Sequence, residues 1–149
     1  MFKKNFLDLW RRIGTHGIMT LSTCSENRVT SRPMSIVVID SKFYCQTDIT
    51  YMKSRQIAEN PNVAVCYKNF SIEGICRMLD NPFQYDFFIN AMRLHFNNAV
   101  DRWSALPTER VLEITPTMIY MWDYDKDDPY IEYWDFKNTA YCKKHMLKK

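Results

Sequence analysis

The side chains best suited to metal or nucleophilic chemistry are scattered along this sequence. The five cysteines include no Cys-x-x-Cys pair, and His16, His95 and His145 form no cluster at the spacing of a metal site. The acidic residues from Asp123 to Asp128 lack the glycine and the final glutamate of an EF-hand loop. No spacing indicates a Ser-His-Asp triad or a catalytic carboxylate pair. The sequence therefore predicts no metal site, and its catalytic residues stay unknown.

The composition is that of one globular domain. Hydrophobic residues make up 46% and charged residues 25% of the 149 residues, enough to build a core without disulfides or metals. A net charge of +3 is too small to indicate nucleic acid as a partner. The odd number of cysteines in apolar surroundings indicates free thiols in a reducing compartment, and we expect a cytoplasmic protein. Near the N-terminus, Asn5 and Asp8 interrupt the apolar residues, which predicts a short amphipathic helix and no membrane segment.

Alternating and β-branched segments predict a succession of short strands. They cover residues 16–23, 29–39, 43–47, 63–67, 71–79 and 130–136, with a long bent strand over 111–122 and a charged tail after 136. Helices are expected at 51–60 and from 82 to about 103. Gly74 inside a strand predicts a bulge or a close backbone approach. This order favours a mainly β fold, an antiparallel barrel of six to seven strands with flanking helices.

Short motifs follow one another in a characteristic order over most of the chain. In sequence they are Leu21-Ser22-Thr23, Ser31-Arg32-Pro33-Met34, Gln46-Thr47-Asp48, Lys53 at a helix start, Asn60-Pro61-Asn62-Val63, Ile114-Thr115-Pro116, Trp122-Asp123 and Trp134-Asp135-Phe136. The series resembles the pyridoxamine 5'-phosphate oxidase-like family of FMN-binding split barrels. This resemblance implies a single Greek-key split-barrel domain over residues 1–149, with FMN as cofactor. It also implies a homodimer with two flavins shared across the interface.

The resemblance further implies which residues hold the cofactor. A phosphomonoester carries roughly two negative charges at neutral pH and needs cations and hydroxyl or amide donors to offset its desolvation. Arg32 would bind the phosphate bidentately, Lys53 would act as a point charge, and Thr47 would add a hydroxyl or amide. Taken singly, Arg32 and Lys53 are ordinary surface residues, and only their combination with Thr47 favours a phosphate site. The remaining expected contacts are Gln46 and, along the isoalloxazine edge, the backbone of Pro33, Met34 and Ser35.

Two more positions bear a weaker likeness to flavin contacts of the family. Asn69 lies near the place where oxidase members carry an amide side chain, and Trp122 or Trp134 would stack near the flavin across a dimer interface. The alternatives are a simple turn residue for Asn69 and core or interface packing for both tryptophans.

For function, the resemblance implies an FMN-dependent oxidoreductase that acts on a small molecule or takes electrons from a donor. True pyridoxamine 5'-phosphate oxidases end with a Trp, then Arg-Leu and a Pro, and nothing after Trp134 matches that motif. Vitamin B6 oxidation is therefore not implied. Two alternatives remain: a non-enzymatic flavin- or haem-binding module, and a reductase that uses the deazaflavin F420.

Overall fold

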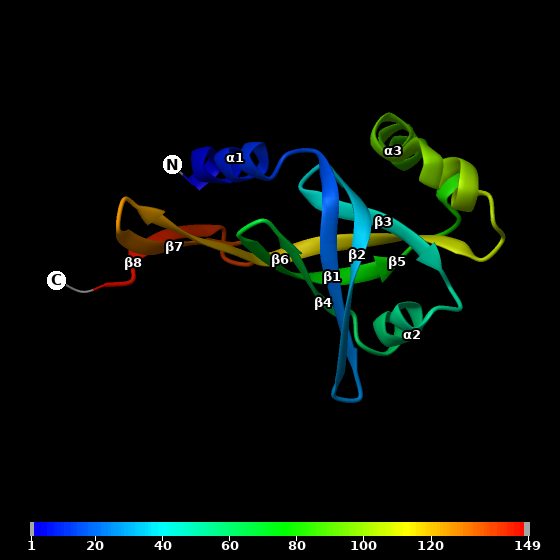
Figure 1. Ribbon diagram of the computed structural model, residues 1–149, viewed down its shortest axis with the longest axis horizontal. Helices are drawn as coiled ribbons and strands as arrows, with labels where there is room; N and C mark the ends of the chain where they lie inside the picture. The colour runs from blue at the N-terminus through cyan, green and yellow to red at the C-terminus, as the bar shows by residue number, and fades with distance from the viewer. Residues whose placement is uncertain (1, 148–149) are drawn as a thin grey trace.

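Eight antiparallel strands and three α-helices make up the residues that the computed structural model describes, 2–147 (Figure 1). The helices are α1 (Phe2–Ile13), α2 (Met52–Glu59) and α3 (Asp86–Ala99), with a 3-10 turn at Pro82–Gln84 and a π-helix at Val100–Ser104. The strands are β1 (His16–Ser25), β2 (Arg28–Ile39), β3 (Lys42–Asp48), β4 (Asn62–Tyr67), β5 (Phe70–Met78), β6 (Glu109–Asp125), β7 (Asp128–Asp135) and β8 (Ala140–His145). The helices predicted at 51–60 and from 82 to about 103 are confirmed, the second being divided into the 3-10 turn, α3 and the π-helix.

Six of the strands close into a barrel. The strand order is β3-β2-β1-β4-β5-β6-β7-β8, and an additional pairing of β3 with β6 joins the ends of the first six. The order β3-β2-β1-β4 is a Greek key, because the fourth strand returns to lie beside the first. The prediction of a mainly β, antiparallel Greek-key split barrel is confirmed. Closure leaves no free sheet edge around the barrel except where two strands separate.

That separation lies between β2 and β3. The two strands pair only from Val37 opposite Tyr44 to Ile39 opposite Lys42, although β2 begins nine residues earlier, at Arg28. Residues 28–36 of β2 therefore have strand β1 on one side and no paired strand on the other, within the described part of the chain. Helix α2 lies at the open end of this gap (Figure 1). The gap exposes backbone and side chains that a closed barrel would bury.

Strand β6 has 17 residues, long enough to form part of both the barrel and a second sheet. Its first part closes the barrel, and its last part forms a sheet with β7 and β8 that projects to the left in Figure 1. The register with β5 shifts at Glu73 and Gly74, where a Cβ on Gly74 would lie 2.9 Å from the Thr115 carbonyl oxygen. The predicted bulge and close approach are thus confirmed, and they bend β6 between barrel and projection.

The projection differs from the sequence prediction at its end. Residues 140–145, expected as part of a charged tail, form the edge strand β8, whose partner is β7. The strand is held by the ring of Tyr141 against Trp134, 5.6 Å apart, and by Lys143 bonded to Asp125 at 3.0 Å. Charged residues are common on edge strands because they discourage pairing with other chains, so charge alone was a misleading sign of a tail.

Helix α1 packs against the sheet of β7 and β8 and has the predicted amphipathic character. Leu9 and Ile13 are fully or almost fully buried, and the Asn5 carbonyl accepts a hydrogen bond of 3.2 Å from the Trp134 indole. Trp134 is 0% exposed, so of its two sequence interpretations core packing is the one confirmed. None of the helices described is long and apolar enough to cross a membrane.

Candidate functional site

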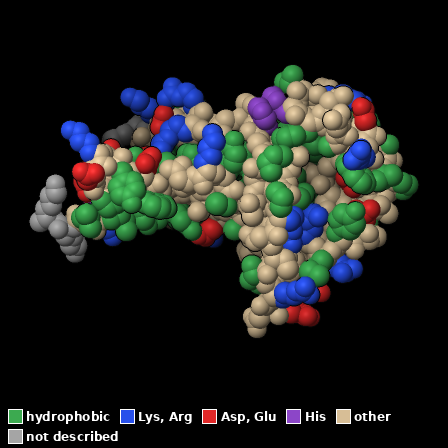
Figure 2. Space-filling view, in the orientation of Figure 1, with side chains coloured by type: hydrophobic (Ala, Val, Ile, Leu, Met, Phe, Trp, Pro, Cys, Tyr) green, Lys and Arg blue, Asp and Glu red, His purple; other side chains and the backbone are tan. Residues whose placement is uncertain are grey.

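Two cations, Arg32 and Lys53, lie at the gap between β2 and β3. Arg32 stands on the unpaired half of β2, and Lys53 in the first turn of α2. Burial lowers the pKa of Lys53, and the positive charge of Arg32 lowers it further, so the two charges are close enough to repel. Neither has a carboxylate within ion-pair distance among residues 2–147. Figure 2 shows basic side chains gathered over this gap, beside α2.

A hydrogen-bond network fixes Arg32 and α2 to the β1–β2 hairpin. The Arg32 guanidinium donates to the Thr23 hydroxyl at 2.9 Å, to the Leu21 carbonyl at 3.2 Å and to the Thr30 hydroxyl. Both hydroxyls in turn donate to the Gln56 side-chain oxygen on α2, at 2.6 and 2.8 Å. The guanidinium is therefore held in place by neutral acceptors, which leave its positive charge uncompensated.

A small pocket of about 190 Å³ lies beside Lys53. Strand β3, α2, the segment after α3 and the start of β6 form its walls, through Gln46, Thr47, Asp48, Tyr51, Lys53, Trp103, Leu106 and Glu109. Two polar atoms of this lining, Gln46 Nε2 and Thr47 Oγ1, are buried without a hydrogen-bond partner. An unsatisfied buried donor costs about 1–3 kcal/mol, and a ligand with acceptor oxygens would recover that cost.

The π-helix Val100–Ser104 determines how Gln46 faces the pocket. The buried Ser104 hydroxyl donates to Gln46 Oε1 at 2.7 Å, which turns the amide nitrogen away from Ser104. The Asn81 side chain holds this turn by donating to the carbonyls of Ser104 and Leu106 at 3.2 and 3.1 Å. No local sequence pattern points to Ser104 or Asn81, because the Ser104–Gln46 contact joins residues 58 positions apart.

Glu109 is a buried acid on the wall of the same pocket. Its carboxyl lies near the Gln46 amide, and the residue is 5% exposed. Burial, and next the Asp48 carboxylate, raise the pKa of Glu109 to about 7, although the nearby Gln46 amide and Lys53 partly offset them. Sequence reasoning missed Glu109, since an acidic residue at the start of a predicted strand is usually exposed.

The other predicted positions divide into two groups. Pro33, Met34 and Ser35 follow Arg32 on the unpaired half of β2, so this segment borders the gap. Asn69 and Trp122 lie elsewhere in the same chain. The Asn69 amide, in the β4–β5 turn, donates to the Trp122 carbonyl at 2.9 Å, and Trp122 is 52% exposed. That turn is about 16 Å along β4 from the end beside α2, so one subunit does not bring the two groups together.

Comparison with known proteins decides the family. Residues 5–123 match the sequence model described as pyridoxamine 5'-phosphate oxidase, which is most of the chain. The chain belongs to the pyridoxamine 5'-phosphate oxidase family. The match includes β1 to β5, all but the last two residues of β6 and all of the candidate cofactor residues, whereas the β7–β8 hairpin lies beyond it. No curated protein matches the sequence.

Solved structures of other proteins have the same fold. General Stress Protein 26 from Bacillus anthracis is 23% identical with a TM-score of 0.60, over 80% of this chain and 93% of that one. A pyridoxamine 5'-phosphate oxidase-related, FMN-binding protein from Nostoc punctiforme is 14% identical with a TM-score of 0.60, over 87% and 86%. The heme storage protein HutZ from Vibrio cholerae is 13% identical with a TM-score of 0.59, over 76% and 89%. At these identities the likeness establishes the fold.

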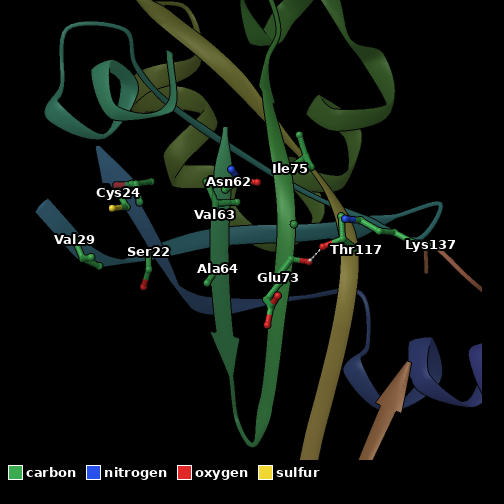
Figure 3. A pocket seen from close by; sticks show the side chains of 12 residues that line it. Ser22, Cys24, Val29, Asn62, Val63, Ala64, Glu73, Ile75, Thr117 and Lys137 are labelled. Atoms are coloured by element: carbon green, nitrogen blue, oxygen red, sulfur yellow. Dashed lines mark hydrogen bonds between the residues drawn. The ribbon is translucent and has the colours of Figure 1, made fainter. Parts of the chain in front are cut away.

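A second, larger hollow of about 420 Å³ lies on the outer face of the barrel, over β1, β4 and β5 (Figure 3). Its lining includes Ser22, Ala64, Glu73 and the cation Lys137. None of the residues predicted to contact the cofactor lines this hollow. Within the described residues the chain thus has a small pocket rich in unpaired polar groups and a larger one without them.

Proposed function

We propose that this family member binds FMN at the gap between β2 and β3, with the phosphate on Arg32 and Lys53. The observation that carries the proposal is the pair of partly buried, mutually repelling cations, neither of which has a carboxylate within ion-pair distance among the described residues. Such an arrangement is costly in the empty protein, because burial and repulsion both disfavour the charges. A dianionic phosphate would remove both costs, which is the expected logic of an anion site.

The neighbouring groups fit a phosphate ester with a polar chain. Thr47 Oγ1 and Gln46 Nε2 are buried donors without partners, adjacent to Lys53 in one pocket. The unpaired edge of β2 at Pro33, Met34 and Ser35 offers backbone groups to a flat, hydrogen-bonding ring system. The Nostoc relative is named an FMN-binding protein, which favours FMN as the ligand of this site.

We propose further that the protein is an FMN-dependent oxidoreductase acting on a small molecule or an electron donor. Bound FMN would supply the hydride or electron chemistry. The chain's own part is to hold the phosphate, to orient the ring along β2 and to exclude water from the gap. This division of work needs no side chain as general acid or base.

A homodimer in the cytoplasm is the expected working form. Its support is apolar surface on the outer side of the barrel, where Ile18, Val29 and Ile75 are between 41% and 67% exposed. Exposed apolar side chains that share one sheet face are typical of an interface between subunits. Trp122 and Asn69, distant from Arg32 in one subunit, would then have to reach the flavin of the partner. Light scattering coupled to gel filtration measures the mass that decides this point.

The absorbance spectrum of the purified protein, with mass analysis of any small molecule released on denaturation, tests the proposal. Flavin bands and released FMN are the expected result. Release of F420, or a Soret band from haem as the name of the Vibrio relative allows, would favour one of the alternatives. A colourless protein that gains no flavin spectrum when FMN is added contradicts the proposal.

A further inference from the structure

Glu109 is unusual among the residues around Lys53, and we propose that it couples flavin phosphate binding to the uptake of one proton. In this account the site binds the dianionic phosphate when the Glu109 carboxyl is protonated, and binds it weakly when that carboxyl is ionised. The inference rests on the proposed function, since it requires the phosphate to lie at Lys53. It adds to that function a residue that determines when the anion is accepted.

Two carboxyls share this end of the barrel. Glu109 is the first residue of β6, and its partner across the β3–β6 ladder is Asp48. Like charges at paired positions of neighbouring strands destabilise a sheet, so the two carboxyls are not expected to ionise equally. One of the two carboxyls is therefore expected to be protonated more readily than the other.

The hydrogen bonds decide which carboxyl stays ionised. Asp48 accepts bonds from the Thr50 amide at 2.8 Å, the Thr50 hydroxyl at 2.6 Å and the Thr108 hydroxyl at 2.6 Å. These donors, Thr108 first, lower the pKa of Asp48. Glu109 is almost fully buried, and the Gln46 amide, which lowers its pKa, is outweighed by burial and by the Asp48 carboxylate. The geometry therefore places the proton of the pair on Glu109.

The charged and titratable groups that face Glu109 come from two elements. Strand β3 contributes Asp48 and the buried thiol Cys45, and the start of α2 contributes Tyr51 and Lys53. The segment after α3 adds the uncharged Trp103 and Leu106. Lys53 is therefore the cation that favours ionised Glu109.

A bound phosphate changes this balance. It would neutralise the charge of Lys53 and add negative charge to the same pocket, so both changes favour the protonated acid. Since the pKa of Glu109 in the empty protein is about 7, a substantial fraction of the molecules must take up a proton on binding near neutral pH.

The test compares the dissociation constant of FMN for the wild type and for Glu109→Gln between about pH 7 and about pH 8.5. In this window the phosphate is already dianionic, because its second pKa is about 6. The wild type should bind about fivefold to tenfold more weakly at the higher pH, the limit being tenfold per pH unit. Glu109→Gln should change by less than about twofold over the same range. Ionised Glu109 raises the pKa of Lys53, so loss of the Lys53 charge at high pH would weaken FMN binding more in Glu109→Gln than in the wild type, which is the opposite of the expected result.

Isothermal titration calorimetry with FMN in two buffers of different ionisation enthalpy counts the protons directly. At about pH 7.5 the wild type should take up roughly half a proton or more for each FMN, as expected for an acid with a pKa near 7. This measurement needs no variant and stands even if Glu109→Gln does not fold. Proton uptake together with a pH-independent Gln variant supports the proposal.

The contrary results are distinct. FMN binding without proton uptake, or with the same pH dependence in wild type and Glu109→Gln, overturns the role of Glu109 but leaves the phosphate site standing. Failure of FMN to bind the wild type at any pH in the range overturns the proposed function, and this inference with it.

Discussion

Two hollows among the described residues, the pocket beside Lys53 and the outer hollow, differ in a way that their sizes do not suggest. The outer hollow over β1, β4 and β5 has about 420 Å³, more than twice the volume of the pocket beside Lys53, at about 190 Å³. Yet the small pocket holds the half-buried cation and both unpartnered donors, Gln46 Nε2 and Thr47 Oγ1. A binding site is marked by unmet electrostatic and hydrogen-bonding needs rather than by space.

In the outer hollow the polar groups largely form hydrogen bonds with protein atoms. The hydroxyls of Ser22 and Ser31 lie 2.7 Å apart, and the Thr117 hydroxyl donates to the Glu73 carbonyl at 3.2 Å. Its cation, Lys137, is exposed to solvent, where a charge needs no partner. A ligand bound there would displace water, but it would supply a partner to no buried, unpaired polar atom of the hollow.

The largest effect expected from this comparison follows loss of both cations of the gap. Arg32→Ala combined with Lys53→Ala should weaken FMN binding by about 100-fold to about 10,000-fold, as each charged hydrogen bond contributes about 1.5–3 kcal/mol. The variant should stay folded because two repelling charges are removed. Fluorescence titration measures the affinity. Lys137→Ala, in the outer hollow, is the matched control. An equal loss of FMN affinity in that variant would contradict the assignment of the phosphate site to Arg32 and Lys53.

Glu109→Gln should change the stability of the FMN-free protein in a pH-dependent way. Its pKa is raised on folding to about 7, so between about pH 4.5 and pH 7 the folded state holds more protons than the unfolded state. The wild type therefore loses stability as pH rises through this range, whereas the variant does not. Above pH 7 the variant should be more stable by about 2 kcal/mol in urea unfolding.

A matched acid sharpens the same experiment. Glu113 is also buried, but it accepts a hydrogen bond from Tyr44 at 3.0 Å and pairs with Arg77 at 3.3 Å. Because its interactions are satisfied, Glu113→Gln should destabilise the protein at neutral pH. Stabilisation by both substitutions, or by neither, contradicts the contrast drawn between the two acids.

Thr47→Val should affect stability and binding in opposite directions. Removal of a buried hydroxyl without a partner should stabilise the FMN-free protein by about 1 kcal/mol, while FMN binds about tenfold more weakly. Thr23→Val provides the contrast, since the Thr23 hydroxyl bonds to both Arg32 and Gln56 and its loss should destabilise the protein. Thermal unfolding and FMN titration of both variants check this pair. A destabilised Thr47→Val would show that its hydroxyl already has a partner.

Ser104→Ala should give the smallest effect. It removes the 2.7 Å hydrogen bond that orients Gln46, so the Gln46 amide would turn more freely in the pocket. We expect FMN to bind about threefold to fivefold more weakly, in proportion to one neutral hydrogen bond of about 1 kcal/mol. Substitution of the exposed neighbour Ala105 by Ser should leave the affinity unchanged. Equal affinities for wild type and Ser104→Ala would show that the π-helix does not influence FMN binding.

The sequence predicts the barrel well because its signals are local. Alternation gave the strands, and a single glycine, Gly74, gave the bulge opposite the bend of β6. The cation pair was accessible through motif order, since Arg32, Thr47 and Lys53 each lie in a short recognisable segment. Strand β8 was missed because the charges of an edge strand resemble those of a tail.

The other wall of the pocket could not be predicted in this way. Glu109, Ser104 and Trp103 reach Lys53 only through the closure of β3 on β6 and the return of the chain after α3. Pairings this distant in sequence leave no local pattern. Asn69 and Trp122 remain predictions for an assembly of two subunits, because in one subunit they contact each other and not the cations.

The most direct test of the central claim compares FMN with riboflavin, which has the same ring and lacks the phosphate. If Arg32 and Lys53 form a phosphate site, the wild type should bind FMN at least about 100-fold more tightly than riboflavin, and the double alanine variant should bind the two about equally. Equal affinities of the wild type for FMN and riboflavin would contradict the account, because the two cations would then have no phosphate to hold.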